Sequence, residues 1–275
     1  MPFIKSVVGN AEPVNIYYED LGKGKTVVFI HGWPLSGSMW EYQVTQLVNQ
    51  GIRCITYDRR GFGKSDQPVG PYDYNTLGHD LKNLIDELKL TDVTLVGFSM
   101  GGGEIAKYFA NHGGANVTKA VVISGVIPYM LKTDDNPDGV PQEVFDKMGK
   151  EMTDDRPTFL EGFNKDFYGV GALHHPVTDA YLRNASNKAM EASPIATIEC
   201  AKAFSGTDFR KDVPSINVPT LVIHGDKDKT VPIKPTGEQT AKLIPGAVFK
   251  IYEDAPHGLW FTHKEQLNQD LVDFI

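Results

Sequence analysis

The stretch LVGFSMGGGE, residues 95–104, decides the fold class, because it places one hydroxyl between an apolar run and a helical pattern. Gly97 and Gly101 lie two positions to either side of Ser99. Gly-x-Ser-x-Gly between a strand and a helix predicts a nucleophile elbow, a sharp turn that exposes the serine at the edge of a sheet. Side chains at the two glycine positions would collide with neighbouring strands and with the helix. The helix N-terminus beneath Ser99 would favour a developing negative charge.

Outward from this stretch, short β-branched runs recur along the chain. They are almost continuously apolar, as is typical of strands buried on both faces of a parallel sheet. The runs are residues 26–30, 52–57, 93–97, 119–124, 219–224 and 248–252. Segments with helical periodicity alternate with them, at about 38–50, 75–90, 99–112, 235–244 and 263–274. Two further runs, 3–8 and 14–19, predict an antiparallel hairpin at the edge of a mostly parallel, eight-stranded sheet flanked by helices.

The alternation of strand and helix stops between Ile127 and about Val213, where helical patterns follow one another. We therefore expect a core formed by residues 1–126 and 214–275, and a helical cap insertion formed by residues 127–213. An insertion at the C-terminal end of a parallel strand lies above the crevice in which such sheets bind ligands.

Composition excludes several classes of protein. Acidic residues outnumber basic ones by 35 to 27 in 275 residues, which argues against a nucleic-acid or anionic-membrane surface. The two cysteines, Cys54 and Cys200, lie in apolar and helical patterns and indicate neither a disulfide framework nor a cysteine-based metal site. The start MPFIKSVVG is too short and polar for a signal peptide, and no run reaches membrane-spanning length. We expect a cytoplasmic protein without a bound metal.

A serine hydroxyl needs a base, and in this fold the acid and then the histidine follow the serine along the chain. Of the eight histidines, His257 lies between the last strand run and the last helical pattern, where the base is expected. The stretch HGDKDKTVP offers two acids after the preceding strand. We favour Asp228, further out on the loop, and expect Asp226 to hold the turn by accepting backbone N–H bonds. Asp254 is a third choice.

Two backbone N–H groups are candidates for an oxyanion hole. One belongs to Met100, the residue after the nucleophile, and the other to Trp33 in the loop HGWPLSGSMW. The alternative for that loop is a plain tight turn.

Seven apolar or aromatic residues lie near the expected pocket and are candidates for substrate binding: Trp33, Phe98, Ile127, Phe163, Phe167, Val231 and Leu259. Phe159, Phe163 and Phe167 recur every fourth residue, so they share one helical face. This face either packs the predicted cap onto the core or lines an acyl pocket, and both can hold.

Five motifs together carry a family resemblance: HGWPLSGSMWEYQ, YDRRGFGKSDQP, LVGFSMGGGE, HGDKDKTVP and APHGLWFTH. They resemble the cofactor-free bacterial haloperoxidases and the related aryl esterases of the α/β-hydrolase fold, over nearly the whole chain and least in the predicted cap. The family's triad falls on Ser99, Asp228 and His257, and its oxyanion donors on Trp33 and Met100. One departure is Gly102, where relatives often carry a larger residue.

The resemblance implies two related reactions. Such enzymes hydrolyse small esters through an acyl-serine without a cofactor. With a short carboxylic acid and hydrogen peroxide they form a peracid, which oxidises halide in solution. A proline after the oxyanion-hole tryptophan goes with stronger perhydrolysis in relatives, and Pro34 follows Trp33 here. Relatives are often trimers or larger, so a homo-oligomer is expected.

Three alternatives stay open at this point. One triad serves all acyl transfers, so a lactamase or lactonase fits the same residues. Haloalkane dehalogenases and epoxide hydrolases use an aspartate at the elbow, and Ser99 disfavours them. A ligand receptor or a non-catalytic interaction protein on a hydrolase scaffold would be distinguished by its lack of rapid, multiple turnovers.

Overall fold

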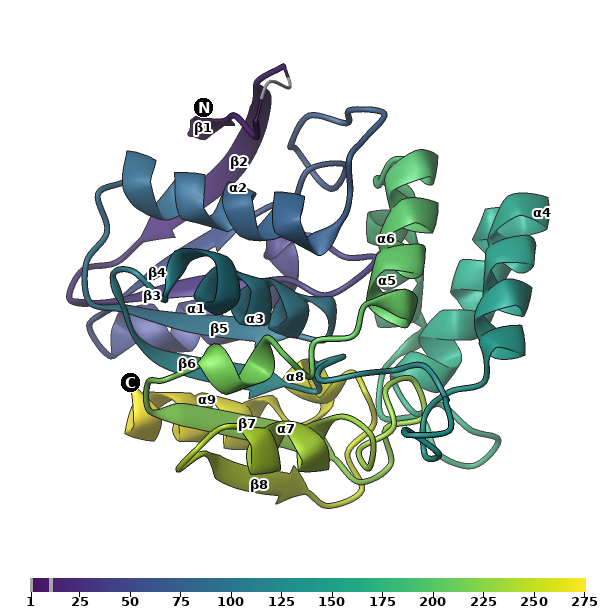
Figure 1. Ribbon diagram of the computed structural model, residues 1–275. Helices are drawn as coiled ribbons and strands as arrows, with labels where there is room; N and C mark the ends of the chain where they lie inside the picture. The colour runs from purple at the N-terminus through teal and green to yellow at the C-terminus, as the bar shows by residue number, and fades with distance from the viewer. Residues whose placement is uncertain (1, 10–11) are drawn as a thin grey trace.

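Strands β3 (Lys25–Ile30) and β5 (Val93–Phe98) lie side by side at the centre of the sheet in the computed structural model, which describes residues 2–9 and 12–275 (Figure 1). Within these residues, eight strands pair in the order β1-β2-β4-β3-β5-β6-β7-β8. The pairs β1–β2 and β2–β4 are antiparallel, and the other pairs are parallel. The predicted mostly parallel sheet with an antiparallel hairpin at its edge is confirmed.

The observed strands and helices begin and end within a few residues of the predicted segments. The remaining strands are β1 (Phe3–Ser6), β2 (Val14–Leu21), β4 (Ile52–Tyr57), β6 (Val117–Ile123), β7 (Thr220–Gly225) and β8 (Val248–Tyr252). The helices outside the predicted cap are η1 (Gly37–Trp40), α1 (Glu41–Asn49), α2 (Tyr74–Glu87), α3 (Met100–His112), η2 (Val213–Ser215), α7 (Gly237–Leu243), α8 (Leu259–Thr262) and α9 (Lys264–Phe274).

Both faces of the sheet are covered, which explains why its strands read as continuous apolar runs. In β3, Val28 and Ile30 belong to one buried apolar cluster, together with side chains of α2 and α3. Val27 and Phe29 belong to a second cluster, together with side chains of α1 and α9. Alternate residues of one strand therefore contribute to two separate cores.

Three helices lie in the predicted cap: α4 (Gln142–Phe167), α5 (Asp179–Met190) and α6 (Pro194–Gly206). They stand together at one side of the sheet, on the right of Figure 1. Helix α4 is two helices joined by a kink, because Asp155 has non-helical backbone angles (φ −154°, ψ 83°) and Pro157 follows it. The Asp155 carboxylate accepts hydrogen bonds from the backbone N–H and the hydroxyl of Thr158, so it caps the second half of the helix.

Both cysteines are buried free thiols, and burial raises the pKa of Cys54 and of Cys200 to about 12. They pack as small apolar side chains. None of the helices in the described part of the chain has both the length and the apolar character that crossing a membrane requires.

Candidate active site

Ser99 occupies the tight turn between β5 and α3. Its backbone has φ 53° and ψ −114°, a conformation that is strained for a residue with a side chain. A Cβ on Gly97 would lie 2.7 Å from the carbonyl oxygen of Gly101, and a Cβ on Gly101 would lie 2.7 Å from that of Ile30. Both glycines are therefore needed for the close approach of strand and helix that this turn makes, as the motif predicts.

The structure brings Ser99, His257 and Asp228 into one chain of hydrogen bonds. Nε2 of His257 lies 2.9 Å from Oγ of Ser99, and Nδ1 of His257 lies 2.6 Å from Oδ2 of Asp228. A carboxylate only accepts, so Nδ1 carries the ring proton and Nε2 is free to accept the proton of the serine. The three residues are 6%, 1% and 8% exposed, in the order serine, histidine, aspartate.

The carboxylate of Asp228 is held at both oxygens. Oδ1 accepts the backbone N–H groups of Thr230 (3.0 Å) and Val231 (2.8 Å). Burial by itself would raise the pKa of Asp228, but the charge of His257 and the hydrogen bonds from His224 and His257 outweigh it and hold that pKa well below its usual value. Asp228 is therefore ionised wherever the protein is folded near neutral pH.

The turn-holding role expected for Asp226 is wrong. Its carboxylate lies 3.5 Å from Nζ of Lys227, and the backbone N–H groups of Thr230 and Val231 bond to Asp228 instead. The side chain of Asp254 is 81% exposed and lies 4.0 Å from the same lysine nitrogen. Of the three candidate acids, Asp228 is the one that the structure places against His257.

Aromatic rings enclose the imidazole of His257. The rings of Phe98 and Phe167 have centroids 4.8 Å and 4.7 Å from it. The backbone N–H of Gly258 donates to the carbonyl of Phe167 over 2.7 Å, which ties the histidine loop to the end of α4. The ring therefore has little freedom to turn away from Ser99.

The two predicted oxyanion donors lie on elements that border Ser99. Met100 is the first residue of α3, where a backbone N–H has no partner within the helix. Gly32, which precedes Trp33, packs so closely that a Cβ built on it would lie 3.3 Å from Cβ of Ser99. The indole of Trp33 donates to the carbonyl of Thr197 in α6 over 2.9 Å, so this residue also contacts the predicted cap.

A cavity of about 290 Å³ opens above Ser99 and His257. Its wall is mainly apolar and comes from α4, α6 and the loops that follow β3, β6 and β7. The residues that line it are Trp33, Ser99, Val126, Met130, Val140, Val144, Phe145, Lys147, Met148, Glu151, Phe159, Phe163, Asp166, Phe167, Phe204, Lys229, Thr230, Val231 and His257. This size suits a small ligand rather than a long chain.

Four of the seven residues predicted to bind substrate line this cavity: Trp33, Phe163, Phe167 and Val231. Phe98, Ile127 and Leu259 are fully buried and do not line it. Phe98 is the last residue of β5 and packs on Trp260, while the carbonyl of Ile127 bonds to the Thr240 hydroxyl in α7. The structure therefore does not place these three side chains at the cavity.

Three apolar residues from the first half of α4 line the cavity and were missed by the sequence analysis: Val144, Phe145 and Met148. Their spacing in EVFDKMG is helical, so the sequence does predict an apolar helical face here. Nothing local in the sequence indicates that this face turns toward Ser99.

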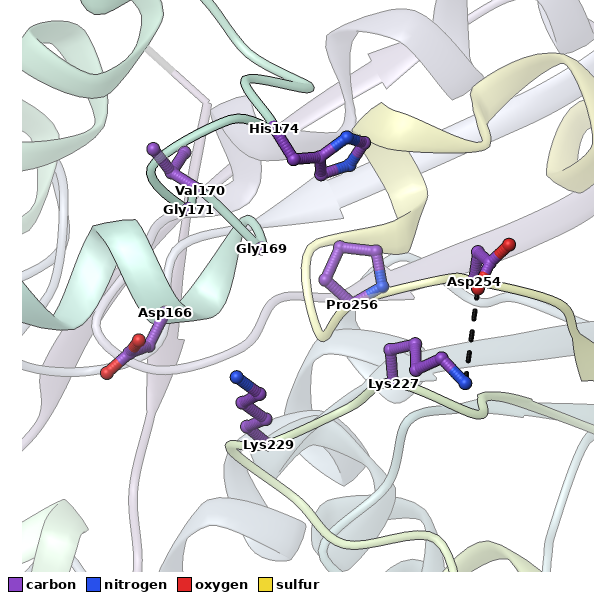
Figure 2. A pocket seen from close by; sticks show the side chains of 9 residues that line it. All are labelled: Asp166, Gly169, Val170, Gly171, His174, Lys227, Lys229, Asp254 and Pro256. Carbon is purple, nitrogen blue, oxygen red and sulfur yellow. Dashed lines mark ion pairs between the residues drawn. The ribbon is translucent and has the colours of Figure 1, made fainter.

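A charged cleft of about 440 Å³ lies next to the apolar cavity, and Figure 2 shows the residues that line this cleft. Asp166 of α4 and Lys229 of the acid loop line both spaces. Figure 2 shows Lys227 directed toward Asp254, whereas Asp166 stands on α4 and Lys229 on the loop that follows β7. The surroundings of Ser99 therefore change from apolar beside the hydroxyl to charged at the edge.

The reactive groups at this site are a hydroxyl, an imidazole and a carboxylate, the set used for nucleophilic acyl transfer. In residues 2–9 and 12–275, no three histidine, cysteine or acidic side chains are grouped so that they could hold a metal ion.

Comparison with known proteins identifies the family. Residues 25–264 match the family described as alpha/beta hydrolase fold. A non-heme chloroperoxidase from Kitasatospora aureofaciens is 42% identical over 268 residues, covering 95% of this chain and 96% of that protein. A bifunctional esterase/perhydrolase from Acinetobacter calcoaceticus is 35% identical over 271 residues, with 98% of each chain covered.

The crystal structure of a bromoperoxidase from Bacillus anthracis superposes with a TM-score of 0.94 at 45% identity and 99% coverage of both chains. The resemblance seen in the motifs is confirmed over the full length. This chain belongs to the α/β-hydrolase family, among its non-heme haloperoxidases and esterases.

Proposed function

We propose that this protein is a serine esterase that cleaves small carboxylic esters through an acyl-serine and can pass the acyl group to hydrogen peroxide. The observation that carries the proposal is the buried hydrogen-bonded chain from Ser99 through His257 to Asp228, open to an apolar cavity of about 290 Å³. The names of its relatives, a chloroperoxidase and an esterase/perhydrolase, support both halves of the activity.

The proposed acylation uses the three hydrogen-bonded residues in turn. His257 takes the proton of the Ser99 hydroxyl, and the oxygen attacks the ester carbonyl. The negative charge that develops on the carbonyl oxygen is stabilised by the backbone N–H groups of Trp33 and Met100. Asp228 keeps the ring proton on Nδ1 and stabilises the imidazolium, which then protonates the departing alcohol.

Deacylation repeats these steps with a second nucleophile. His257 removes a proton from water, which attacks the acyl-serine and releases a carboxylic acid and the free Ser99 hydroxyl. If hydrogen peroxide attacks instead, the C–O bond to the serine breaks in the same way and the product is a peracid. Halide is then oxidised by the peracid in solution, which requires no protein-bound cofactor.

We also propose that residues 127–213 act as a cap that sets substrate range, since α4 supplies much of the cavity wall. Assembly into a homo-oligomer, a trimer or larger, is proposed from the family resemblance, and sedimentation velocity tests it. A cytoplasmic location is proposed because the free thiols of Cys54 and Cys200 suit a reducing compartment. Fractionation of expressing cells tests that location.

The test of function is steady-state hydrolysis of p-nitrophenyl acetate by the wild type and Ser99→Ala, with and without hydrogen peroxide. We expect many turnovers by the wild type, none by the variant, and diversion of the acyl group to peracetic acid when peroxide is added. Equal, slow release by both proteins would contradict an esterase. A lactone and a β-lactam tested in parallel distinguish the other acyl hydrolases, and a single slow turnover would indicate a receptor.

A further inference from the structure

His31 is a buried histidine that the proposed mechanism does not use. It follows β3 directly and precedes Gly32 and Trp33, so it stands at the base of the predicted oxyanion loop. Its side chain is fully buried, and both of its ring nitrogens have close polar neighbours. A buried imidazole with both nitrogens engaged has a fixed orientation, so its bonds can fix the orientation of its neighbours.

The neighbours of the ring determine which nitrogen carries the proton. The backbone N–H of Arg59 points at Nε2 over 2.9 Å, so Nε2 is an acceptor and carries no proton. Nδ1 lies 2.8 Å from the carbonyl oxygen of Gly32, which only accepts. Nη1 of Arg59 is also 3.3 Å from Nδ1. If Nδ1 accepted a hydrogen bond from Nη1, the ring proton would be on Nε2 and would point at the backbone N–H of Arg59, which is itself a donor. Nδ1–H therefore donates to Gly32.

The charge state of the ring agrees with this assignment. Burial, followed by the charge of Arg59, lowers the pKa of His31 well below its usual value, so the ring is neutral and has one proton.

The acceptor of this bond belongs to the peptide that contains the Trp33 N–H. In a trans peptide, the carbonyl of one residue and the N–H of the next are fixed in one plane and point in opposite directions. The Gly32 carbonyl accepts from Nδ1 of His31 over 2.8 Å and from the backbone N–H of Leu35 over 3.1 Å. Two donors on one oxygen set the tilt of the plane, and the plane sets the direction of the Trp33 N–H.

This peptide borders the nucleophile. A Cβ built on Gly32 would lie 3.3 Å from Cβ of Ser99 and 2.5 Å from a ring atom of Phe98. Hydrogen bonding to a peptide carbonyl also polarises the N–H of the same peptide and strengthens it as a donor.

Arg59 connects the same support to the nucleophile helix. Its Nη2 donates to the carbonyl of His31 over 2.7 Å, and its Nε donates to Oε1 of Glu104 in α3 over 2.8 Å. Arg59 and Glu104 are both buried, so the ion pair is held in a fixed geometry. The elements that carry the two predicted oxyanion donors are thus joined through His31, Arg59 and Glu104.

We propose that His31 is a positioning residue for the oxyanion hole: its Nδ1–H bond to the Gly32 carbonyl orients the Trp33 N–H toward the transition-state oxygen. This inference rests on the proposed esterase function. His31 acts through the peptide and does not touch the substrate.

Two variants separate the two ring nitrogens. His31→Asn leaves an amide donor at about the place of Nδ1, and His31→Gln leaves an amide acceptor at about the place of Nε2 while removing the donor to Gly32. For p-nitrophenyl acetate, we expect His31→Gln to lower kcat by roughly 10-fold with little change in KM, less than the 10²–10³-fold cost of deleting an oxyanion donor. His31→Asn should retain most of kcat.

Phenylboronic acid provides a readout that a merely structural role would not change. Its tetrahedral adduct with Ser99 places an oxygen where the oxyanion forms, so His31→Gln should weaken its inhibition by about the factor that kcat loses. Equal losses in both variants, or losses that follow the fall in melting temperature, would refute the proposal. So would a kcat of His31→Gln within about twofold of the wild type.

Nitrogen NMR of the wild type tests the bond without a substitution, and so does not depend on whether the variants fold. We expect His31 to carry its proton on Nδ1, and a proton on Nε2 would overturn the assignment. The Ser99→Ala experiment remains independent of these tests. If Ser99→Ala is inert and His31→Gln is fully active, the esterase stands and the role of His31 falls.

Discussion

Nε2 of His224 lies 3.4 Å from Oδ2 of Asp228, the same oxygen that accepts the proton of His257 over 2.6 Å. Nε2 of His224 is also 2.8 Å from the carbonyl of Val231, which only accepts, so this nitrogen carries its ring proton. Two imidazoles and two backbone N–H groups therefore surround one buried carboxylate. This surrounding holds Asp228 ionised and pointing at His257.

Asp228→Asn should remove most of the activity without removing the nucleophile. An amide in place of the carboxylate favours the wrong tautomer of His257, and with the same three groups in serine proteases the loss of kcat is about 10⁴-fold. Steady-state hydrolysis of p-nitrophenyl acetate measures this loss of kcat. Asp226→Asn, two residues away and paired with Lys227, is the matched control and should retain wild-type kcat. An active Asp228→Asn enzyme would exclude this aspartate as the acid.

The depressed pKa of Asp228 predicts a pH dependence of stability. The folded pKa lies below the unfolded value of about 3.9, so ionised Asp228 stabilises the folded state above about pH 4. This contribution is lost as the pH falls through the folded pKa. The difference in free energy of unfolding between the wild type and Asp228→Asn, from urea titrations at pH 5 and pH 3, should be smaller at pH 3. A difference that grows toward pH 3 would contradict a stabilising contribution from ionised Asp228.

Phe163→Ala should extend the acyl-chain range. The Phe163 ring lines the cavity and meets the ring of Trp33 edge to face at 5.3 Å, so its removal opens apolar space close to Ser99. Each extra methylene buried there contributes about 0.8 kcal/mol, roughly fourfold in kcat/KM. p-Nitrophenyl acetate, butyrate and hexanoate measure the profile. Phe261→Ala removes a ring that stacks on Tyr181 outside the cavity wall and should leave the profile unchanged. An unaltered acyl-chain profile in Phe163→Ala would mean that the helical face with Phe163 only packs the cap onto the core.

Gly101→Ala should destabilise the elbow. Its Cβ would lie 2.7 Å from the carbonyl oxygen of Ile30, which belongs to the central strand and cannot easily move. We expect a loss of about 1–3 kcal/mol in the free energy of unfolding, the usual cost of overpacking. Gly149→Ala is the control, because Gly149 lies within α4 with no atom near its built Cβ, and alanine there should stabilise by about 0.5–1 kcal/mol. Thermal unfolding of both variants checks the contrast.

Features that depend on short-range pattern were predictable from the sequence. The strands were readable because side chains such as Val27 and Val28 are buried on opposite faces, which makes the run continuously apolar. The turn at Ser99 was readable because its geometry demands glycine at two nearby positions.

Features that depend on side-chain direction in irregular segments were not predictable. The sequence favoured Asp228 as the acid, and the structure places this carboxylate against His257. Nothing in the sequence indicates that the same carboxylate, and not that of Asp226, also accepts the backbone N–H groups of the turn. Phe98 and Leu259 are apolar and lie near the site in the fold, but their side chains are fully buried in the core. The rotation of α4 that brings Phe145 to the cavity follows from tertiary packing.

The kink at Asp155 divides the cavity wall of α4 into two rigid arms, one with Phe145 and Met148 and the other with Phe159, Phe163 and Phe167. The reacting groups Ser99, Asp228 and His257 all stand on loops outside this helix. Much of the apolar wall thus lies on a piece of chain that carries none of the three reacting groups. Substitutions at Phe145, Met148, Phe159 and Phe163 can therefore reshape the cavity without replacing a reacting group or Phe167, which packs on His257.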